Sequence, residues 1–559
     1  MLNHYEYLKK FFENGAHNAV ARIDRNPDSI SYGTVPNGWS DTYNAGMFFH
    51  YVLLSTVAYY LKDTKCYRDS IFMEVADDVL SGSERYINED GSIDLDSTNF
   101  HDPSYCAFMV RDWLGPALHI MRKYSQHTEV EDKLEAHITK ILKGFSGPLK
   151  HFGFHTPNHR WIICSALHYI HEFFGDEEAL EVINRFYSEG IDCDANGEYT
   201  ERSAGTYNLI CNSSFIQIAH TTGNTDFLEY PIRNMKLMYS YYEPDRTICT
   251  INSTRQDRGT APSFEMYYNS YLPLAYYTGD SEFAYFADLA LKKRIAQSDT
   301  MEKPYESCDS LALYWFLIRD DWMDKHDSIE SVKPTRDASK YLEESGLARI
   351  YNRGTTLTVL RSFNADFLKF QMGSSSVYAR FAGSFFGSPH SQFRPKKMEK
   401  TEKGYKVSSL ENAGYRSQMP TPPPTSEWRK MDHSKREIIN VQNFKTEVEV
   451  IPYDGGFSVD ASYTGADRIP VKLEISMAPG CKVITDQINF ISKANDYIYL
   501  KEGEITLIFP GAGKLKIKGG AYAHMVSEGM RGTESVPSGQ FTICITGKTP
   551  GKMHVEFEY

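Results

Sequence analysis

The sequence lacks the patterns that mark several common classes of protein. No run of lysine and arginine is long enough to suggest a nucleic-acid or anionic-membrane partner, and the formal net charge is −13. No apolar run approaches the roughly 18 residues that a membrane span needs. Nine cysteines are scattered without CxxC spacing, which favours buried free thiols over a disulfide framework. We therefore expect no nucleic-acid partner and no membrane span.

Motifs of nucleotide and metal chemistry are missing as well. The sequence contains no HExxH, no cysteine-based zinc spacing, no P-loop and no usable GxSxG, so a nucleotide cofactor is not expected. Residues 1–5 (MLNHY) do not begin a signal peptide. We expect a cytoplasmic protein, or a periplasmic or extracellular bacterial protein if a signal has been removed.

The chain has ample material for packed cores. A single core stops growing at about 250–300 residues, so a chain of 559 residues is expected to form two domains. Hydrophobic residues make up 41%, and 38 Tyr and 32 Phe far outnumber 6 Trp. Tyrosine-rich surfaces suit sugar clefts, because an apolar ring with a hydroxyl edge fits a carbohydrate, although core packing is the commoner use.

The first part of the chain has the three- and four-residue apolar spacing of helices. The expected helices cover residues 5–21, 43–61, 67–86, 104–124, 129–145, 157–174, 177–187, 207–220, 226–239, 264–278, 281–295 and 307–317. Their short joints fit antiparallel hairpins stacked in a ring. Longer polar joints at 94–102, 152–158, 192–205 and 251–263 recur at one end of alternate hairpins, so they are expected to converge around one mouth.

A polar, charged stretch at 327–340 is the expected linker, and after it the apolar period changes to two. The expected strands cover residues 346–351, 355–361, 367–371, 376–381, 446–451, 456–460, 471–475, 497–500, 505–509, 514–517 and 541–545. Residues 396–433, rich in lysine and proline, are expected to be a long surface insertion. The sequence thus predicts an (α/α) toroid, an incomplete barrel of helix hairpins, in domain 1–335 and an antiparallel β-sandwich in domain 336–559.

One polar stretch, residues 154–161, stands at the start of an expected helix. Pro157 suits the first helical turn, so Asn158 and His159 should lie near a helix N-terminus. An Asn-His pair there could bind an anionic group and move a proton. Arg160 follows as a candidate substrate-binding residue. The alternative is a capped helix with a surface histidine.

Two further loops carry candidate groups. In residues 198–208, Tyr207 can accept and donate a proton if a nearby cation such as Arg202 or Arg255 stabilises its charged form, and Glu201 is a candidate substrate ligand. In residues 252–259, Arg255 and Arg258 suit a clamp on a carboxylate. The alternatives are an N-capping loop around Tyr207 and a solvated Arg–Asp loop.

The remaining candidates are spread along the chain. His390 lies in a Gly/Pro turn of the β half, where it is either a turn residue or a group that faces the helical domain. Trp39, His101 and Tyr267 are further candidate substrate-binding residues.

This order of features resembles the heparinase II/III-like and alginate-lyase-like polysaccharide lyases, in which an (α/α) toroid precedes a large antiparallel β-domain. The resemblance implies that Asn158, His159, Tyr207 and His390 form the catalytic set, together with Arg255. That group's β-domain carries a His-x-His metal signature, but here the run is His390-Ser391-Gln392. The identity of a structural divalent metal is therefore left open, and no cofactor is required.

The resemblance implies β-elimination at C4 of a uronic acid, with an acidic glycan as substrate and an unsaturated uronate as product. Asn158 and Arg255 or Arg202 would neutralise the carboxylate. Tyr207 would serve as both base and acid in a syn reaction, and His159 or His390 as the base in an anti reaction. One branch with this architecture removes rhamnose from glucuronate in arabinogalactan, and a short exo-acting site would suit an acidic surface.

Two other functions stay open from the sequence. A toroid glycoside hydrolase would need paired carboxylates, for which Glu201 with Asp257 or Asp102 could serve. A glycan-binding protein without catalysis would need no pair of catalytic carboxylates. The sequence does not indicate an oligomeric state.

Overall fold

The computed structural model describes residues 1–36, 45–95, 102–300, 308–361, 364–521 and 529–559. These residues divide into two compact units. Unit 1 comprises residues 1–239 and 253–335, and unit 2 comprises residues 240–252 and 336–559. The segment 240–252, which lies within the predicted helical domain 1–335, thus groups with the β half.

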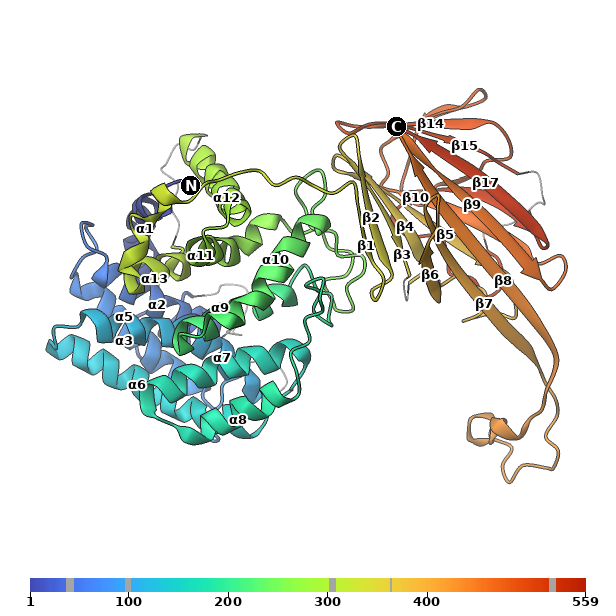
Figure 1. The fold of residues 1–559 in the computed structure, drawn as a ribbon. Coiled ribbons are helices and arrows are strands. Elements are labelled where there is room, and N and C mark those ends of the chain that lie inside the picture. Colours follow the sequence, from blue (N-terminus) through green and yellow to red (C-terminus); the bar gives the residue numbers. More distant parts are fainter. Residues whose placement is uncertain (37–44, 96–101, 301–307, 362–363, 522–528) are drawn as a thin grey trace. The chain divides into compact units, whose positions relative to one another are not determined.

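Unit 1 is helical throughout (Figure 1). Its helices are α1 (His4–Val20), α2 (Gly46–Tyr60), α3 (Ser70–Ser83), α4 (Cys106–Met109), α5 (Gly115–Tyr124), α6 (Glu129–His151), α7 (Pro157–Phe174), α8 (Glu177–Ser188), α9 (Tyr207–Thr222), α10 (Glu229–Tyr241), α11 (Tyr268–Thr278), α12 (Ser281–Thr300) and α13 (Ser310–Ile318).

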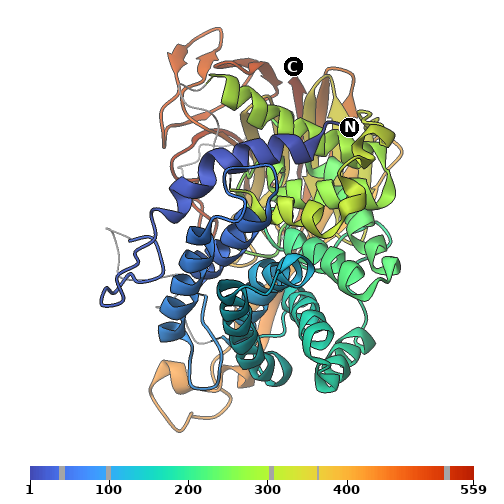
Figure 2. The same cartoon turned by 90° about the vertical axis from the view of Figure 1, so that its left-hand side faces the viewer.

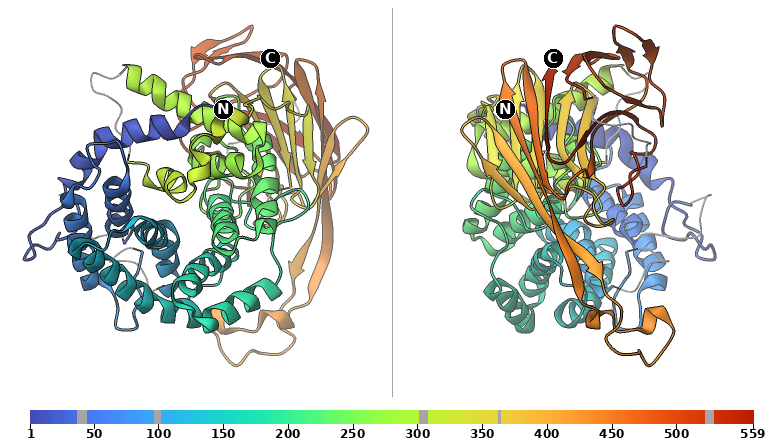
Figure 3. Two further views of the ribbon diagram at one scale, coloured as in Figure 1. Left: turned by 60° about the vertical axis from the view of Figure 1, so that its left-hand side comes forward. Right: turned by 90° about the vertical axis from the view of Figure 1, so that its right-hand side faces the viewer.

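The helices form two concentric layers because they differ in how much of their surface is apolar. Ten consecutive residues of α7, 161–170, are buried, and α9, α11 and α13 are also buried nearly all round, so they form the inner layer. In contrast, α6 and α8 bury one stripe only and lie outside. Figures 2 and 3 show the helices following one another around a curved array, and α13 packs against α2 and so brings its two ends together. The predicted toroid is confirmed.

Helix ends follow from local sequence. A capping box of Thr128 and Glu131 begins α6, and Asp176 caps α8. Gly175 and Gly223 end α7 and α9 at φ 65° and 68°, in the left-handed region that favours glycine because it has no Cβ. All nine cysteines are free thiols, most of them buried, as the spacing predicts. No helix in the described ranges is long and apolar enough to cross a membrane.

Unit 2 contains two sheets, both antiparallel except for the β13–β16 pair. One sheet has the order β1-β2-β3-β4-β5-β10-β16-β13 and the other β12-β11-β14-β15-β17-β9-β8-β7-β6. The strands are β1 (Ser339–Leu342), β2 (Leu347–Asn352), β3 (Thr355–Leu360), β4 (Asp366–Met372), β5 (Ser375–Gly383), β6 (Lys397–Lys400), β7 (Tyr405–Arg416), β8 (Ile438–Tyr453), β9 (Gly456–Gly465), β10 (Pro470–Met477), β11 (Lys482–Ile484), β12 (Asn489–Ile491), β13 (Tyr497–Tyr499), β14 (Glu504–Phe509), β15 (Gly513–Lys518), β16 (Phe541–Lys548) and β17 (Gly551–Glu558).

The period-two strands bury alternate side chains in one core between the sheets. Val448 and Val450 of β8 and Val459 of β9 are fully or almost fully buried, and they pack in the same cluster as Phe381 and Ile475 of the other sheet. The predicted β-sandwich is confirmed.

Residues 396–433 are only partly the insertion that their composition predicts. Residues 397–400 and 405–416 are strands β6 and β7, because the first half of β7 alternates buried and less buried side chains against β8. Lysine density at the edge of a sheet hid this pattern, since edge strands tolerate charge. Only the loop at 417–437 is irregular, apart from two short 3-10 turns.

A buried ionic cluster holds residues 240–252 in unit 2. This connecting hairpin places Glu243, whose side chain is fully buried, against Arg349 of β2 at 2.9 Å and Lys369 of β4 at 2.8 Å. Thr356 of β3 also donates to the carboxylate. Burial alone would raise the pKa of the Glu243 carboxyl, but Arg349 and Lys369 outweigh it and hold that pKa at about 2. Three strands are thus tied to the hairpin through one carboxylate.

Candidate active site

Hydrogen bonds join successive polar loops of unit 1 in three places. The Phe154 amide donates to Asp102 at 3.3 Å. The Thr254 hydroxyl donates to the Glu201 carbonyl at 2.8 Å, and the Gly205 amide donates to Asp257 at 2.9 Å. Asn158 also donates to Glu201, which links the loop 152–158 to the loop 192–205. Hydrogen bonds thus connect described residues of all four polar joints. Their convergence around one mouth stays a prediction.

Asn158 is buried beneath the surface of the site, where its side chain contacts the Glu201 carboxylate. It is fully buried in the first turn of α7, and its amide nitrogen donates to both Glu201 carboxylate oxygens at 3.0 and 2.9 Å. Its backbone amide donates to the same carboxylate at 3.2 Å. Burial raises the pKa of the Glu201 carboxyl, while Asn158 and Arg255 oppose that rise. These contacts position Asn158 to orient Glu201, and the predicted direct contact with a substrate carboxylate stays a prediction.

Arg255 connects this buried pair to Tyr207. Its guanidinium lies 3.4 Å from the Glu201 carboxylate and 4.8 Å from the centroid of the Tyr207 ring. The Arg255 side chain keeps 32% of its surface exposed. Tyr207 is the first residue of α9, and the Gln256 side-chain amide donates to its hydroxyl. A cation and a phenol are thus held together at a partly open surface.

His159 is arranged as a neutral base. Its Nδ1–H donates to the Phe154 carbonyl at 2.8 Å, so Nε2 carries the lone pair of the neutral ring. The ring packs edge-on against Tyr105 and Phe108, at centroid distances of 6.1 and 6.2 Å. Burial lowers the pKa of His159, and the positive charge of Arg255 lowers it further.

Other predicted substrate-binding residues have structural partners. Arg160 pairs with Glu189 and Asp192, both at 3.1 Å, and stacks on Trp161. The buried Tyr267 hydroxyl donates to the Ala204 carbonyl at 2.7 Å, which supports the loop before Tyr207.

The remaining arginines contribute to loop structure, and two predicted residues cannot be placed. Arg258 donates to the Ser253 carbonyl within its own loop, and Arg202 adopts φ 50° beside Glu201. Trp39 and His101 lie outside the described residues.

The carboxylates that a hydrolase would use are engaged elsewhere. Asp257 accepts from Ser253 at 2.5 Å and from Gly205, and Asp102 accepts from Ser104 at 2.6 Å and from Phe154. Both carboxylates therefore hold loop conformations. Neither is paired with Glu201 by these contacts, as the two catalytic carboxylates of a hydrolase would have to be.

His390 belongs to unit 2, in the turn after β5. Its Nδ1 bonds to Glu411 of β7 at 2.9 Å. The neighbouring Ser391 and Gln392 are buried and bond to backbone carbonyls of Phe385 and Phe381, so they are not free to complete a metal site. Among the described residues, no group of three or more His, Cys, Asp and Glu is arranged to hold a metal ion. The catalytic role of His390 stays a prediction.

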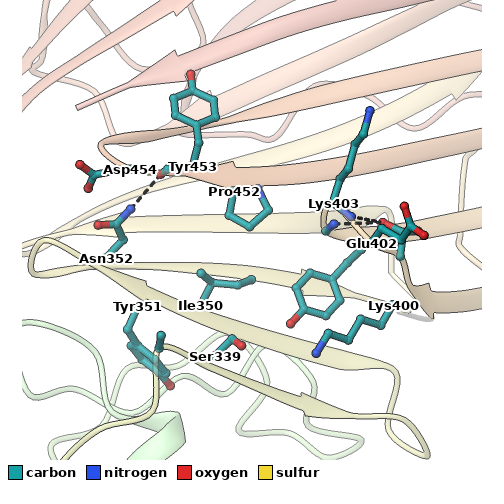
Figure 4. A pocket seen from close by; sticks show the side chains of 14 residues that line it. Ser339, Ile350, Tyr351, Asn352, Lys400, Glu402, Lys403, Pro452, Tyr453 and Asp454 are labelled. Carbon is teal, nitrogen blue, oxygen red and sulfur yellow. Dashed lines mark hydrogen bonds between the residues drawn. The ribbon is translucent and has the colours of Figure 1, made fainter.

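A pocket of about 450 Å³ lies at one end of the sheets in unit 2 (Figure 4). Ile350 and Pro452 lie at its centre, Lys400 reaches toward it, and Asn352 donates to the Tyr453 carbonyl at 2.8 Å. Its lining contains no histidine or cysteine, and its charged groups are of both signs.

Sequence reasoning overlooked the groups that tune the site. Gln256 lies in the Arg255 loop without a motif that indicates its contact with Tyr207, and no pattern marks Tyr105, Phe108 or the Phe154 carbonyl as neighbours of His159. Aromatic and amide side chains of this kind give no local signal, because their partners lie far away in sequence.

Neither a protein-family model nor a curated protein matches the sequence. Solved structures do resemble it. A xanthan lyase from Paenibacillus aligns with a TM-score of 0.53 and 11% identity over 98% of this chain and 56% of that chain. Chondroitin AC lyase from Streptomyces coelicolor A3 aligns with a TM-score of 0.52 and 10% identity over 99% of this chain and 79% of that chain.

This chain thus spans little more than half the length of the xanthan lyase. At such low identity the likeness concerns the fold. The arrangement expected from the sequence, a helical toroid followed by a β-sandwich, is therefore the fold of these polysaccharide lyases.

Proposed function

We propose that this protein is a polysaccharide lyase that cleaves a glycosidic bond at C4 of a glucuronate-type uronic acid by β-elimination. The observation that carries the proposal is the Arg255 guanidinium stacked on Tyr207 and paired with Glu201. A neutral His159, in the first turn of α7 next to Asn158, adds a base. The likeness of fold to polysaccharide lyases supports the same reaction class.

Each group has a defined task in the reaction. Arg255 binds the uronate carboxylate and stabilises the negative charge that develops when the C5 proton leaves. His159 accepts that proton at Nε2. The C5–H electron pair forms the C4–C5 double bond, the C4–O bond breaks, and Tyr207 protonates the leaving oxygen. Asn158 acts through Glu201, as a positioning residue for Arg255.

The charge distribution favours a substrate with few charges. Residues 1–335 hold 49 Asp and Glu against 30 Lys and Arg, a net charge of −19, whereas residues 336–559 hold 24 against 30, a net charge of +6. A long polyanion would be repelled by the helical part. A glycan chain end with one uronate and a neutral neighbouring sugar would not be repelled in this way. We therefore infer exo action on a rhamnose-capped arabinogalactan.

The proposal is tested by incubating the protein with alginate, glycosaminoglycans and rhamnose-capped arabinogalactan. A lyase product absorbs ultraviolet light through its new double bond, whereas a hydrolase product does not. We expect absorbance to rise with the rhamnose-capped substrate and free rhamnose to appear in equal amount. Sugar release without absorbance would indicate a hydrolase, and binding without either would indicate a glycan-binding protein.

The pH dependence tests the base. Burial lowers the pKa of His159 below its ordinary value of 6.5, and the base works only when unprotonated. We therefore expect kcat/KM to fall as the pH drops through a midpoint below 6.5. In His159→Gln this acid limb should vanish from the residual activity, whereas His127→Gln, at an exposed histidine, should keep it. A limb that persists in His159→Gln would assign the base to another group, such as Tyr207 in a syn reaction.

A further inference from the structure

A two-stranded arm extends from the β-sandwich of unit 2 (Figure 1). The arm is residues 412–443, that is, the outer part of β7, the loop 417–437 and the outer part of β8. The two strands pair with each other from Asn412 and Asn443 outward. In the described chain, β9 pairs with β8 only from Phe444 onward, and β6 pairs with β7 only over residues 405–408. Both edges of the arm are therefore without a neighbouring strand.

The arm exposes large apolar side chains on both faces. Tyr415 is 61% exposed, Ile438 55%, Ile439 40% and Val441 59%. Ile438 and Ile439 are consecutive in one strand, so they point to opposite faces. Trp428, at the tip, is 63% exposed. An isolated two-stranded ribbon is marginally stable, and a concentration of large exposed apolar side chains on such a ribbon suits an interface.

The charge of the arm indicates its partner. The arm holds five Lys and Arg against three Asp and Glu, a net charge of +2, whereas residues 1–335 carry −19. Two arms would repel each other, but an arm and a helical unit would attract. Arg416, Arg429, Lys430, Lys435 and Arg436 are the cationic residues of the arm.

We propose that the arm binds the helical unit of a second copy of this chain, so that two copies hold each other reciprocally. Such an interface is closed and two-fold symmetric, since each copy gives one arm and receives one. Apolar contact supplies the attraction at short range, and the opposite charges select the orientation.

Sedimentation velocity of the full chain, over a dilution series from micromolar to nanomolar, measures this association. We expect a dimer that dissociates on dilution and more readily at high salt, because screening weakens the charge attraction. The double variant Ile439→Asp/Val441→Asp should raise the dimer dissociation constant at least about tenfold.

The matched control replaces two equally exposed residues of the same sheet outside the arm. Ile491→Asp/Ile508→Asp, at positions 55% and 40% exposed, should dimerise like the wild type. Circular dichroism establishes that both variants fold. A wild type that is monomeric throughout the series, or an arm variant that dimerises as the wild type does, would overturn the proposal.

A second measurement uses the wild type alone and locates the contact. Copies grown with ¹⁴N and ¹⁵N are mixed and treated with a lysine-reactive cross-linker. Cross-links between light and heavy copies should join Lys430 or Lys435 to residues of unit 1. Cross-links from these lysines that occur only within one copy would show that the arm binds its own chain, and would refute the proposal.

Discussion

Tyr207→Phe is expected to lower kcat by about 10²–10⁴-fold while changing KM only a few-fold. The substitution removes the hydroxyl that protonates the leaving oxygen and that accepts from Gln256, but it keeps the ring on which Arg255 stacks. Arg255, held by its Glu201 partner, should therefore still bind the uronate. The measurement is steady-state ultraviolet absorbance with the substrate that the glycan screen identifies.

Tyr67→Phe is the control, since Tyr67 is a 38% exposed tyrosine of the same unit with no part in the cluster. It should behave as the wild type. A Tyr207→Phe enzyme with nearly normal kcat would remove Tyr207 from the reaction. A variant with normal kcat and a greatly raised KM would give Tyr207 a role in binding only.

Glu243→Ala is expected to destabilise unit 2 by about 3–5 kcal/mol, because it leaves the Arg349 and Lys369 charges buried without a counter-charge. The change also releases the connecting hairpin from β2, β3 and β4. Hydrogen–deuterium exchange of peptides from these three strands, measured with increasing urea, reports the loss directly. Protection should fall in β2–β4 at lower urea than in the wild type.

The exposed pair of Asp454 and Arg353 provides the control for charge removal. Both side chains are more than half exposed, so Asp454→Ala should cost no more than about 1 kcal/mol. If Glu243→Ala costs as little as Asp454→Ala, the cluster does not hold the hairpin in place.

The stability that Glu243 contributes should also depend on pH. Its folded-state pKa of about 2 is below the ordinary value of 4.5, so the folded state favours the ionised form. The stabilisation is fully present above pH 4.5 and is lost as the pH falls toward 2. The Glu243→Ala protein should lack this part of its acid sensitivity.

The site could be predicted only in part from the sequence. Pro157 and the apolar run after it located the start of α7, and the apolar helix after residue 206 located Tyr207, since both signals are local. The burial of Asn158 on Glu201 and the contact of Gln256 with Tyr207 join positions 43 and 49 residues apart. No local pattern indicates such pairs, because they form only when the hairpins pack.

The sequence by itself determined the two-part architecture, most helix spans and the change to strands after residue 335, because apolar period and capping residues act over a few positions. Only the tertiary structure decided that residues 240–252 belong with the β-sandwich and that β6 and β7 are strands. It alone decided which ring nitrogen of His159 carries the proton. The first two depend on partners distant in the chain, a buried ion pair and a neighbouring strand. The third depends on how the loop before α7 folds the Phe154 carbonyl back onto the His159 ring.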